Sequence, residues 1–265
     1  MTRILRYLVA IILIITPTAI PTASAVAQER GNSFGISDNV MADVDQLIDR
    51  AKRNKTLALV IIGANWCHDT RSLTDNLDDP AMQAALKGYD YTLVNADQFA
   101  ESVALVKRFQ QATLYATPTL LIINPETEGL VNSHDMHQWR DAYKMPLAEK
   151  IAYFERMKDP KNHTEPRAFT PYRELNNILS RVWQFERQQA ARIEAVYGTF
   201  IPLVEDHAED RPDNFIKQWN ELFDLRAQLT DDIARLEKEA KDRFMAGERN
   251  FDVTLPSYPK FSWED

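Results

Sequence analysis

The chain has 265 residues, with 31 basic and 39 acidic side chains and a formal net charge of −8. This acidic balance argues against nucleic acid as a partner, because nucleic-acid-binding domains present a basic surface. The length allows one or two domains with a buried core, and the single cysteine, Cys67, excludes an internal disulfide.

The first 27 residues have the layout of a secretory signal peptide. Arg3 and Arg6 precede an apolar stretch, and small residues lead to a predicted cleavage point after Ala25 or Ala27. The stretch is shorter than the roughly 20 apolar residues that span a bilayer, so an uncleaved anchor is the less favoured alternative. We therefore expect a periplasmic or secreted protein without stable membrane insertion after cleavage. Cleavage leaves 29 basic and 39 acidic residues, a formal charge of about −10.

Residues 36–158 alternate between helical and strand patterns. Apolar positions three and four apart predict a helix over 38–53. The continuous apolar run 57–62 predicts a strand that is buried on both faces, and the alternating, aromatic-rich run 89–95 predicts another. Further helices are predicted over 67–77, 80–86, 97–110 and 139–157, and strands over 119–123 and 130–132 on either side of a turn at 124–129.

The cysteine follows directly after the first predicted strand, in the sequence Trp66-Cys67-His68-Asp69-Thr70. A thiol at the start of a helix meets the partial positive charge of the helix N-terminus, which favours thiolate over thiol. Cys67 is therefore a candidate nucleophile. The alternative is an inert cysteine buried in the core.

A second motif, Thr117-Pro118-Thr119, begins the strand predicted over 119–123, where a proline would interrupt an ordinary strand. Together the two motifs resemble the thioredoxin superfamily, in which a Trp-Cys-x-x-Cys motif ends one strand and a cis-proline faces the cysteine. The resemblance covers residues 36–158. It implies an α/β fold with a central mixed sheet flanked by helices, and a substrate groove formed by Trp66, Thr117 and Pro118.

The sequence departs from the thioredoxin pattern at two positions. Thr70 replaces the second cysteine, and Ile61 stands where many thioredoxins carry a buried acid. A hydroxyl cannot resolve a mixed disulfide, so an external thiol must do so. The resemblance then implies monothiol exchange of the isomerase or mixed-disulfide type with a protein or low-molecular-weight thiol or disulfide, and no cofactor.

Two neighbours are expected to assist Cys67 in this chemistry. A protonated His68 would stabilise the thiolate. Thr70, one turn along the helix, could donate a hydrogen bond to the sulfur. Cys67, His68 and Thr70 are therefore the predicted catalytic residues, and the alternative for His68 is an exposed loop residue without a role.

Two histidines follow the strand predicted over 130–132. By the resemblance, their loop lies beside the cysteine, so His134 is expected in the substrate groove. Convergence of His134, His137, His68 and Cys67 would instead give a copper or zinc module. A non-enzymatic binding or scaffold protein, with or without such a metal, is the alternative function.

The second half of the chain has a different pattern. Residues 159–170 read as a linker, and 171–250 as two helices of about 35 residues, each roughly 50 Å long, joined by a short polar connection. Such a connection predicts an antiparallel hairpin of the coiled-coil type, and 251–265 read as an irregular tail. We expect the helices to pack on each other and on the first domain in a monomer. The alternative is a dimerisation or partner-binding arm.

Overall fold

A computed structural model describes residues 33–164, 167, 169–205 and 211–264. The predicted signal peptide lies outside these residues. Within the described part of the chain, no helix is long and apolar enough to cross a membrane.

A four-stranded mixed sheet forms the centre of the first unit, in the order β2-β1-β3-β4. β1 (Leu57–Gly63) runs parallel to β2 (Tyr89–Asn95) and antiparallel to β3 (Thr119–Asn124), which pairs with the short β4 (Gly129–Leu130). All but the first residue of β1 are buried, as the continuous apolar run predicts for a strand with both faces covered.

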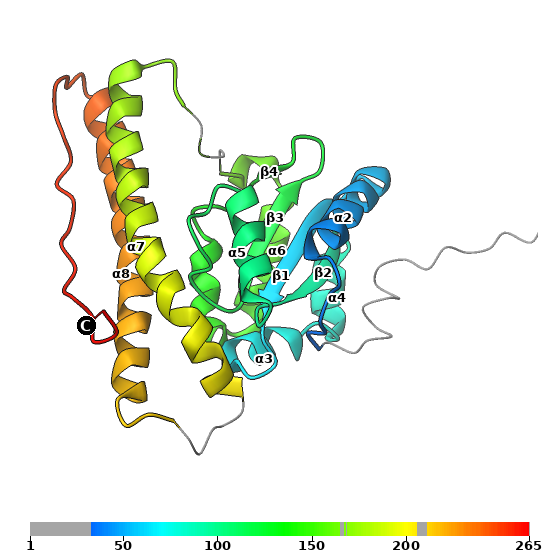
Figure 1. The fold of residues 1–265 in the computed structure, drawn as a ribbon. Helices are drawn as coiled ribbons and strands as arrows, with labels where there is room; N and C mark the ends of the chain where they lie inside the picture. The colour runs from blue at the N-terminus through cyan, green and yellow to red at the C-terminus, as the bar shows by residue number, and fades with distance from the viewer. Residues whose placement is uncertain (1–32, 165–166, 168, 206–210, 265) are drawn as a thin grey trace, which may run out of the picture.

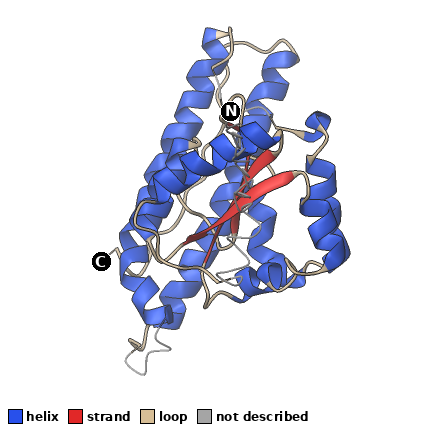
Figure 2. Cartoon of the chain, turned by 90° about the vertical axis from the view of Figure 1, so that its right-hand side faces the viewer, coloured by secondary structure: helices blue, strands red, loops and turns tan. Residues whose placement is uncertain are grey.

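Helices cover both faces of this sheet (Figure 2). α2 (Val40–Asn54) and α5 (Phe99–Arg108) pack against Ala58, Val60 and Ile62 on one face. On the other face, Leu59 and Ile61 meet residues of α3 (His68–Thr74), α4 (Pro80–Leu86), η1 (Met136–Lys144) and α6 (Leu147–Met157). Alternate residues of β1 thus belong to two separate hydrophobic cores, one on each face of the sheet. This architecture confirms the predicted thioredoxin-like fold class.

The prediction of a single helix over 139–157 is wrong, because the helical conformation is interrupted before Pro146. Met145 is extended, with φ −78° and ψ 122°, and Pro146 is the N-cap of α6. A proline disfavours the helical conformation of the residue before it, and it begins a helix readily. The segment therefore splits into the 3₁₀ helix η1 and the α-helix α6.

The strand predicted over 130–132 is shorter than expected, because a side chain replaces part of its backbone pairing. Asn132 is fully buried, and its amide accepts a hydrogen bond from Ile122 N–H and donates one to the Leu120 carbonyl. These bonds satisfy backbone groups of β3 where the ladder has ended.

The second unit is the predicted antiparallel hairpin of α7 (Arg173–Glu205) and α8 (Phe215–Met245), which lie side by side (Figure 1). η2 (Pro160–Asn162) is a short turn before it. The apolar stripes of α7 and α8 form one core, and residues 246–264 run back along the hairpin with Val253 and Phe261 buried in that core. The apolar faces of α7 and α8 therefore bury each other within one chain.

The hairpin also packs on the first unit. The ring of Tyr197 on α7 stacks on Phe99 of α5, with centroids 4.6 Å apart. Lys107 forms an ion pair with Glu194 at 2.9 Å, and Tyr115 is buried within the hairpin's core. This packing places α8 near the carboxyl end of the central strand β1, which Cys67 follows in the sequence.

Candidate functional site

Cys67 lies at the carboxyl end of β1, where a short loop leads into α3. It is the N-cap residue of α3, and its backbone carbonyl accepts the amide of Arg71 at 3.0 Å. The side chain is 7% exposed, and its thiol donates a hydrogen bond to the Thr117 carbonyl, with 3.2 Å between sulfur and oxygen. The thiol thus connects the motif at residues 66–70 with the motif at residues 117–119.

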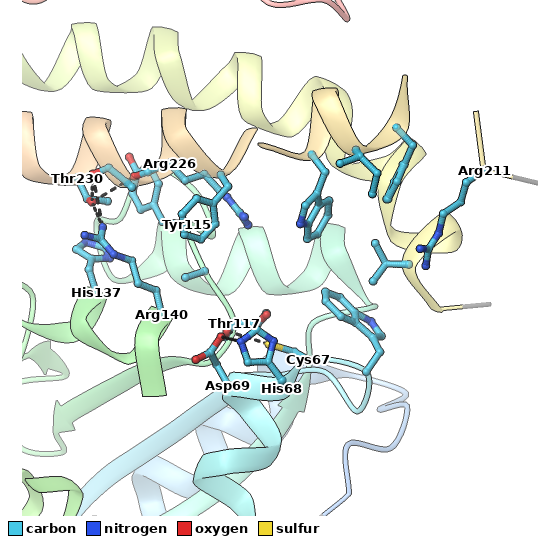
Figure 3. A pocket seen from close by; sticks show the side chains of 18 residues that line it. Cys67, His68, Asp69, Tyr115, Thr117, His137, Arg140, Arg211, Arg226 and Thr230 are labelled. Carbon is cyan, nitrogen blue, oxygen red and sulfur yellow. Dashed lines mark hydrogen bonds and ion pairs between the residues drawn. The ribbon is translucent and has the colours of Figure 1, made fainter. Parts of the chain in front are cut away.

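The peptide bond between Thr117 and Pro118 is cis, as the resemblance predicted. Ala116 and Thr117 line the cavity beside Cys67, whereas Pro118 does not. Thr119 closes this turn with a hydrogen bond from its hydroxyl to the Ala116 carbonyl at 2.7 Å. The carbonyl of Thr117, directly before the proline, therefore accepts the hydrogen bond of the thiol (Figure 3).

Thr70 does not interact with the sulfur, so the expected hydrogen bond between them is wrong. The residue is fully buried, and its hydroxyl has no hydrogen-bond partner. Its methyl group lies over Gly63, where an added Cβ would come within 2.6 Å of it. Thr70 is thus a packing residue under the site, and Gly63 allows the close approach.

His68 and Asp69 form a pair in the cavity wall. His68 Nε2 lies 3.0 Å from an Asp69 carboxylate oxygen, and its ring meets the edge of Tyr143 at 5.5 Å. The other carboxylate oxygen accepts the Tyr143 amide at 2.8 Å. Burial raises the pKa of Asp69, against the opposing effects of the Tyr143 amide and His68. The imidazole is thus held by Asp69, and no hydrogen bond joins it to the sulfur among the described residues.

Trp66 forms the side of the cavity next to the thiol. Its indole N–H donates to Asp97 at 2.8 Å, which fixes the plane of the ring. The ring meets Trp219 of α8 edge to face, with centroids 6.4 Å apart. Trp66 therefore joins the expected groove to the hairpin.

His137, rather than the predicted His134, lines the cavity beside Cys67. His134 is exposed and lines a separate, more polar cavity of about 460 Å³ that does not include Cys67, so its predicted place beside the thiol is wrong. His137 lines both cavities, and its ring meets the edge of Tyr115 at 5.3 Å. Burial, with the charges of Arg140 and Arg167, lowers the pKa of His137 to about 3, so its imidazole is neutral near pH 7.

The residues that the structure describes contain no ligand set for the alternative function as a metal-binding module. No three His, Cys, Asp or Glu side chains lie close enough there to hold a metal ion. The predicted convergence of Cys67 with His134 does not occur, since they line different cavities.

A cavity of about 390 Å³ lies directly against Cys67, between the first unit and α8 (Figure 3). Such a volume is typical of small-molecule sites. The first unit contributes Trp66, Cys67, His68, Asp69, Tyr115, Ala116, Thr117, His137 and Arg140. The hairpin and its connection contribute Val204, Arg211, Phe215, Ile216, Trp219, Phe223, Arg226, Ala227 and Thr230.

Sequence reasoning missed the half of the cavity that comes from the hairpin. Phe215 and Trp219 belong to the apolar stripe of α8 and also pack in the core of the hairpin. A signal was present in Ile216 and Phe223, two large apolar residues outside that stripe, which are 61% and 47% exposed. Apolar residues on the polar face of an amphipathic helix indicate a second contact surface.

No protein-family model matches this chain, and no curated protein matches it. Among solved structures, the chain is similar to the disulphide isomerase from Xylella fastidiosa Temecula1, with 18% sequence identity and a TM-score of 0.43. The match covers 48% of this chain and 98% of that chain.

Proposed function

We propose that this chain carries out monothiol thiol-disulfide exchange through Cys67. The observation that carries the proposal is the position of the only thiol, at the end of β1 and against the carbonyl of Thr117, in the wall of a cavity. A nucleophilic sulfur needs both a route for its partner and a polar group that positions it, and Cys67 has both.

The exchange has two balanced steps. The Cys67 thiolate attacks one sulfur of a disulfide, forming a mixed disulfide and releasing the other sulfur as a thiolate. An external thiol, as its thiolate, then attacks the mixed disulfide and regenerates the Cys67 thiolate. Because the chain has no second cysteine, it cannot complete the second step itself. This chemistry is that of an isomerase or of mixed-disulfide turnover, not that of a self-sufficient reductase.

We place this activity outside the cytoplasm, in the periplasm or the secreted fraction. The support is the arrangement of Arg3, Arg6, the apolar stretch and the small residues before Ala27. Disulfides persist in such compartments, so a monothiol exchanger would meet its substrates there.

The unfolded chain provides the matched reference for a test, since it contains the same single thiol. The rate of mixed-disulfide formation with dithiodipyridine is measured near pH 7 in the folded protein and in urea, with the product verified by mass. The folded protein should react faster than the unfolded chain, form one adduct per chain, and recover the free thiol when glutathione is added. Cys67→Ser should form no adduct. A folded protein that reacts more slowly than its unfolded chain would contradict the proposal and indicate an inert buried cysteine.

A further inference from the structure

The cavity beside Cys67 carries an unbalanced positive charge on the side formed by the hairpin. Arg226 projects from α8 into the space above the thiol (Figure 3). Its guanidinium donates to the Tyr197 hydroxyl and lies over the rings of Tyr197 and Trp219, at 5.4 and 5.6 Å from their centroids. Its Nε is buried without a hydrogen-bond partner, and no carboxylate pairs with Arg226 among the described residues.

The other charged groups of the cavity wall do not offset Arg226. Arg211 adds a second guanidinium on the hairpin side, where it donates to the Leu203 carbonyl at 2.9 Å and lies over the Phe215 ring. Arg140 has its own carboxylates, Asp141 at 3.7 Å and Asp231 at 3.5 Å. Asp69 is the one acidic residue of the described cavity lining, and it is held by His68 and the Tyr143 amide. A partly buried cation without a counter-charge is costly unless a ligand supplies one.

The rest of the hairpin wall is aromatic. Phe215, Trp219 and Phe223 lie on the same side of the cavity as Arg226. Phe215 and Trp219 stack with centroids 6.0 Å apart, and Trp219 also meets Trp66 of the first unit. These rings give an apolar surface next to the guanidinium groups of Arg226 and Arg211, an arrangement that suits a small molecule with an apolar body and an anionic end.

We infer that the hairpin makes the site selective for low-molecular-weight disulfides that carry a carboxylate, with Arg226 binding the carboxylate while the disulfide reaches Cys67. The inference rests on the proposed function and names its substrate class. α8 forms one wall of the cavity beside Cys67, and the space of about 390 Å³ fits a small molecule.

The selectivity is measured with two chromogenic aromatic disulfides, the anionic dithiobis(nitrobenzoate) and the neutral dithiodipyridine. Each rate with the folded protein is divided by the rate with the same chain unfolded in urea, which removes the intrinsic reactivity of the reagent. The anionic-to-neutral ratio should fall about tenfold in Arg226→Gln, because a charge-assisted hydrogen bond is lost. It should keep most of its value in Arg226→Lys, which retains the charge. Arg53→Gln, at an exposed position on α2, changes the net charge equally and should leave the ratio unchanged.

A binding measurement separates the substrate class from the exchange chemistry. Calorimetry on Cys67→Ser should detect binding of dithiodipropionate, weakened about tenfold by adding Arg226→Gln, and no binding of the neutral bis(hydroxyethyl) disulfide. This result without any exchange by the unmodified protein would sustain the anion site and overturn the proposed function. Exchange with an anionic-to-neutral ratio that is the same in Arg226→Gln would overturn the inference and leave the proposed function standing.

Discussion

Cys67 meets a backbone carbonyl rather than a second polar side chain. The resemblance to the thioredoxin superfamily predicted that the thiol, the proline turn and Trp66 lie together, because a cis-proline faces the cysteine in that family. The sequence could not show which way Thr70 points, since a residue one turn along a helix faces the sulfur or the core depending on the packing beneath. The close approach of Thr70 to Gly63 decides for the core.

Replacing Thr70 by valine tests this assignment. Its hydroxyl is buried without a partner, and an unsatisfied buried hydroxyl costs about 1 to 3 kcal/mol. Because valine has nearly the same shape, Thr70→Val should raise the free energy of unfolding by about 1 kcal/mol in urea denaturation. The alkylation rate of Cys67 should stay the same in the folded protein. A lower alkylation rate would show that Thr70 assists Cys67, as the sequence analysis expected.

His137 makes the stability of the protein sensitive to acid. Its pKa is about 3 in the folded chain and about 6.5 in an unfolded one, so the unfolded state holds the extra proton between these values. The free energy of unfolding therefore falls as the pH falls from about 6.5 towards 3. His137→Asn should lose less stability than the unmodified protein between about pH 7 and about pH 4.5, measured by urea denaturation at each pH. The exposed His134→Asn serves as the control, and an equal pH response in all three proteins would refute the assignment.

At the scale of elements, the strands and most helices of the first unit could be predicted because their patterns are local. The split at Pro146 was missed, although the proline was visible, since the apolar spacing continues across it. The second wall of the cavity could not be predicted. It depends on where α8 lies relative to β1, and that placement is set by contacts between side chains far apart in the sequence, such as Phe99 with Tyr197.

The segment between the two units is held by a buried ionic cluster. Arg167 pairs with Glu186 of α7 at 2.5 Å and with Glu237 of α8 at 2.9 Å. Tyr115 of the first unit donates to Glu186 at 2.8 Å, and Trp183 donates to Glu237 at 2.8 Å. Burial and the neighbouring carboxylate raise the pKa of Tyr115, so its phenol remains a donor. The predicted linker therefore ties both helices of the hairpin to the first unit.

Removing the cation from this cluster should be costly. Arg167→Met leaves Glu186 buried without its cation and Glu237 with only the more distant Lys241, at 3.9 Å, and should lower the free energy of unfolding by about 3 kcal/mol. Adding Glu186→Gln and Glu237→Gln should recover part of the loss, because both amides can still accept from Tyr115 and Trp183. The exposed pair Arg181 and Asp252 provides the control, since breaking it by Arg181→Met should cost less than about 1 kcal/mol. Equal losses in the two arginine variants, by urea denaturation, would contradict the role of the cluster.

At the scale of the whole molecule, the site belongs to neither unit alone. The first unit supplies the thiol and the Thr117 carbonyl, and the hairpin supplies the aromatic and cationic wall. The hairpin thus has a use that does not require a second chain. Its apolar stripes are already covered, because residues such as Leu222 and Leu229 of α8 share one core with Leu179 and Val182 of α7.

We therefore expect the full chain to be a monomer. A stable dimer buries about 800 Å² on each partner. Of the large apolar side chains exposed on α8, Ile216 and Phe223 line the cavity beside Cys67, and Met245 lies at the other end of the helix. A chain that ends at Pro160 should also be monomeric, but less stable, because it loses the contacts that the hairpin makes with Phe99 and Tyr115. Light scattering over a range of concentrations measures the mass of both chains, and urea denaturation measures their stability. A full-length dimer that becomes a monomer on truncation would show instead that the hairpin is a dimerisation arm. The apolar contacts between α7 and α8 would then not be the only ones that the hairpin makes.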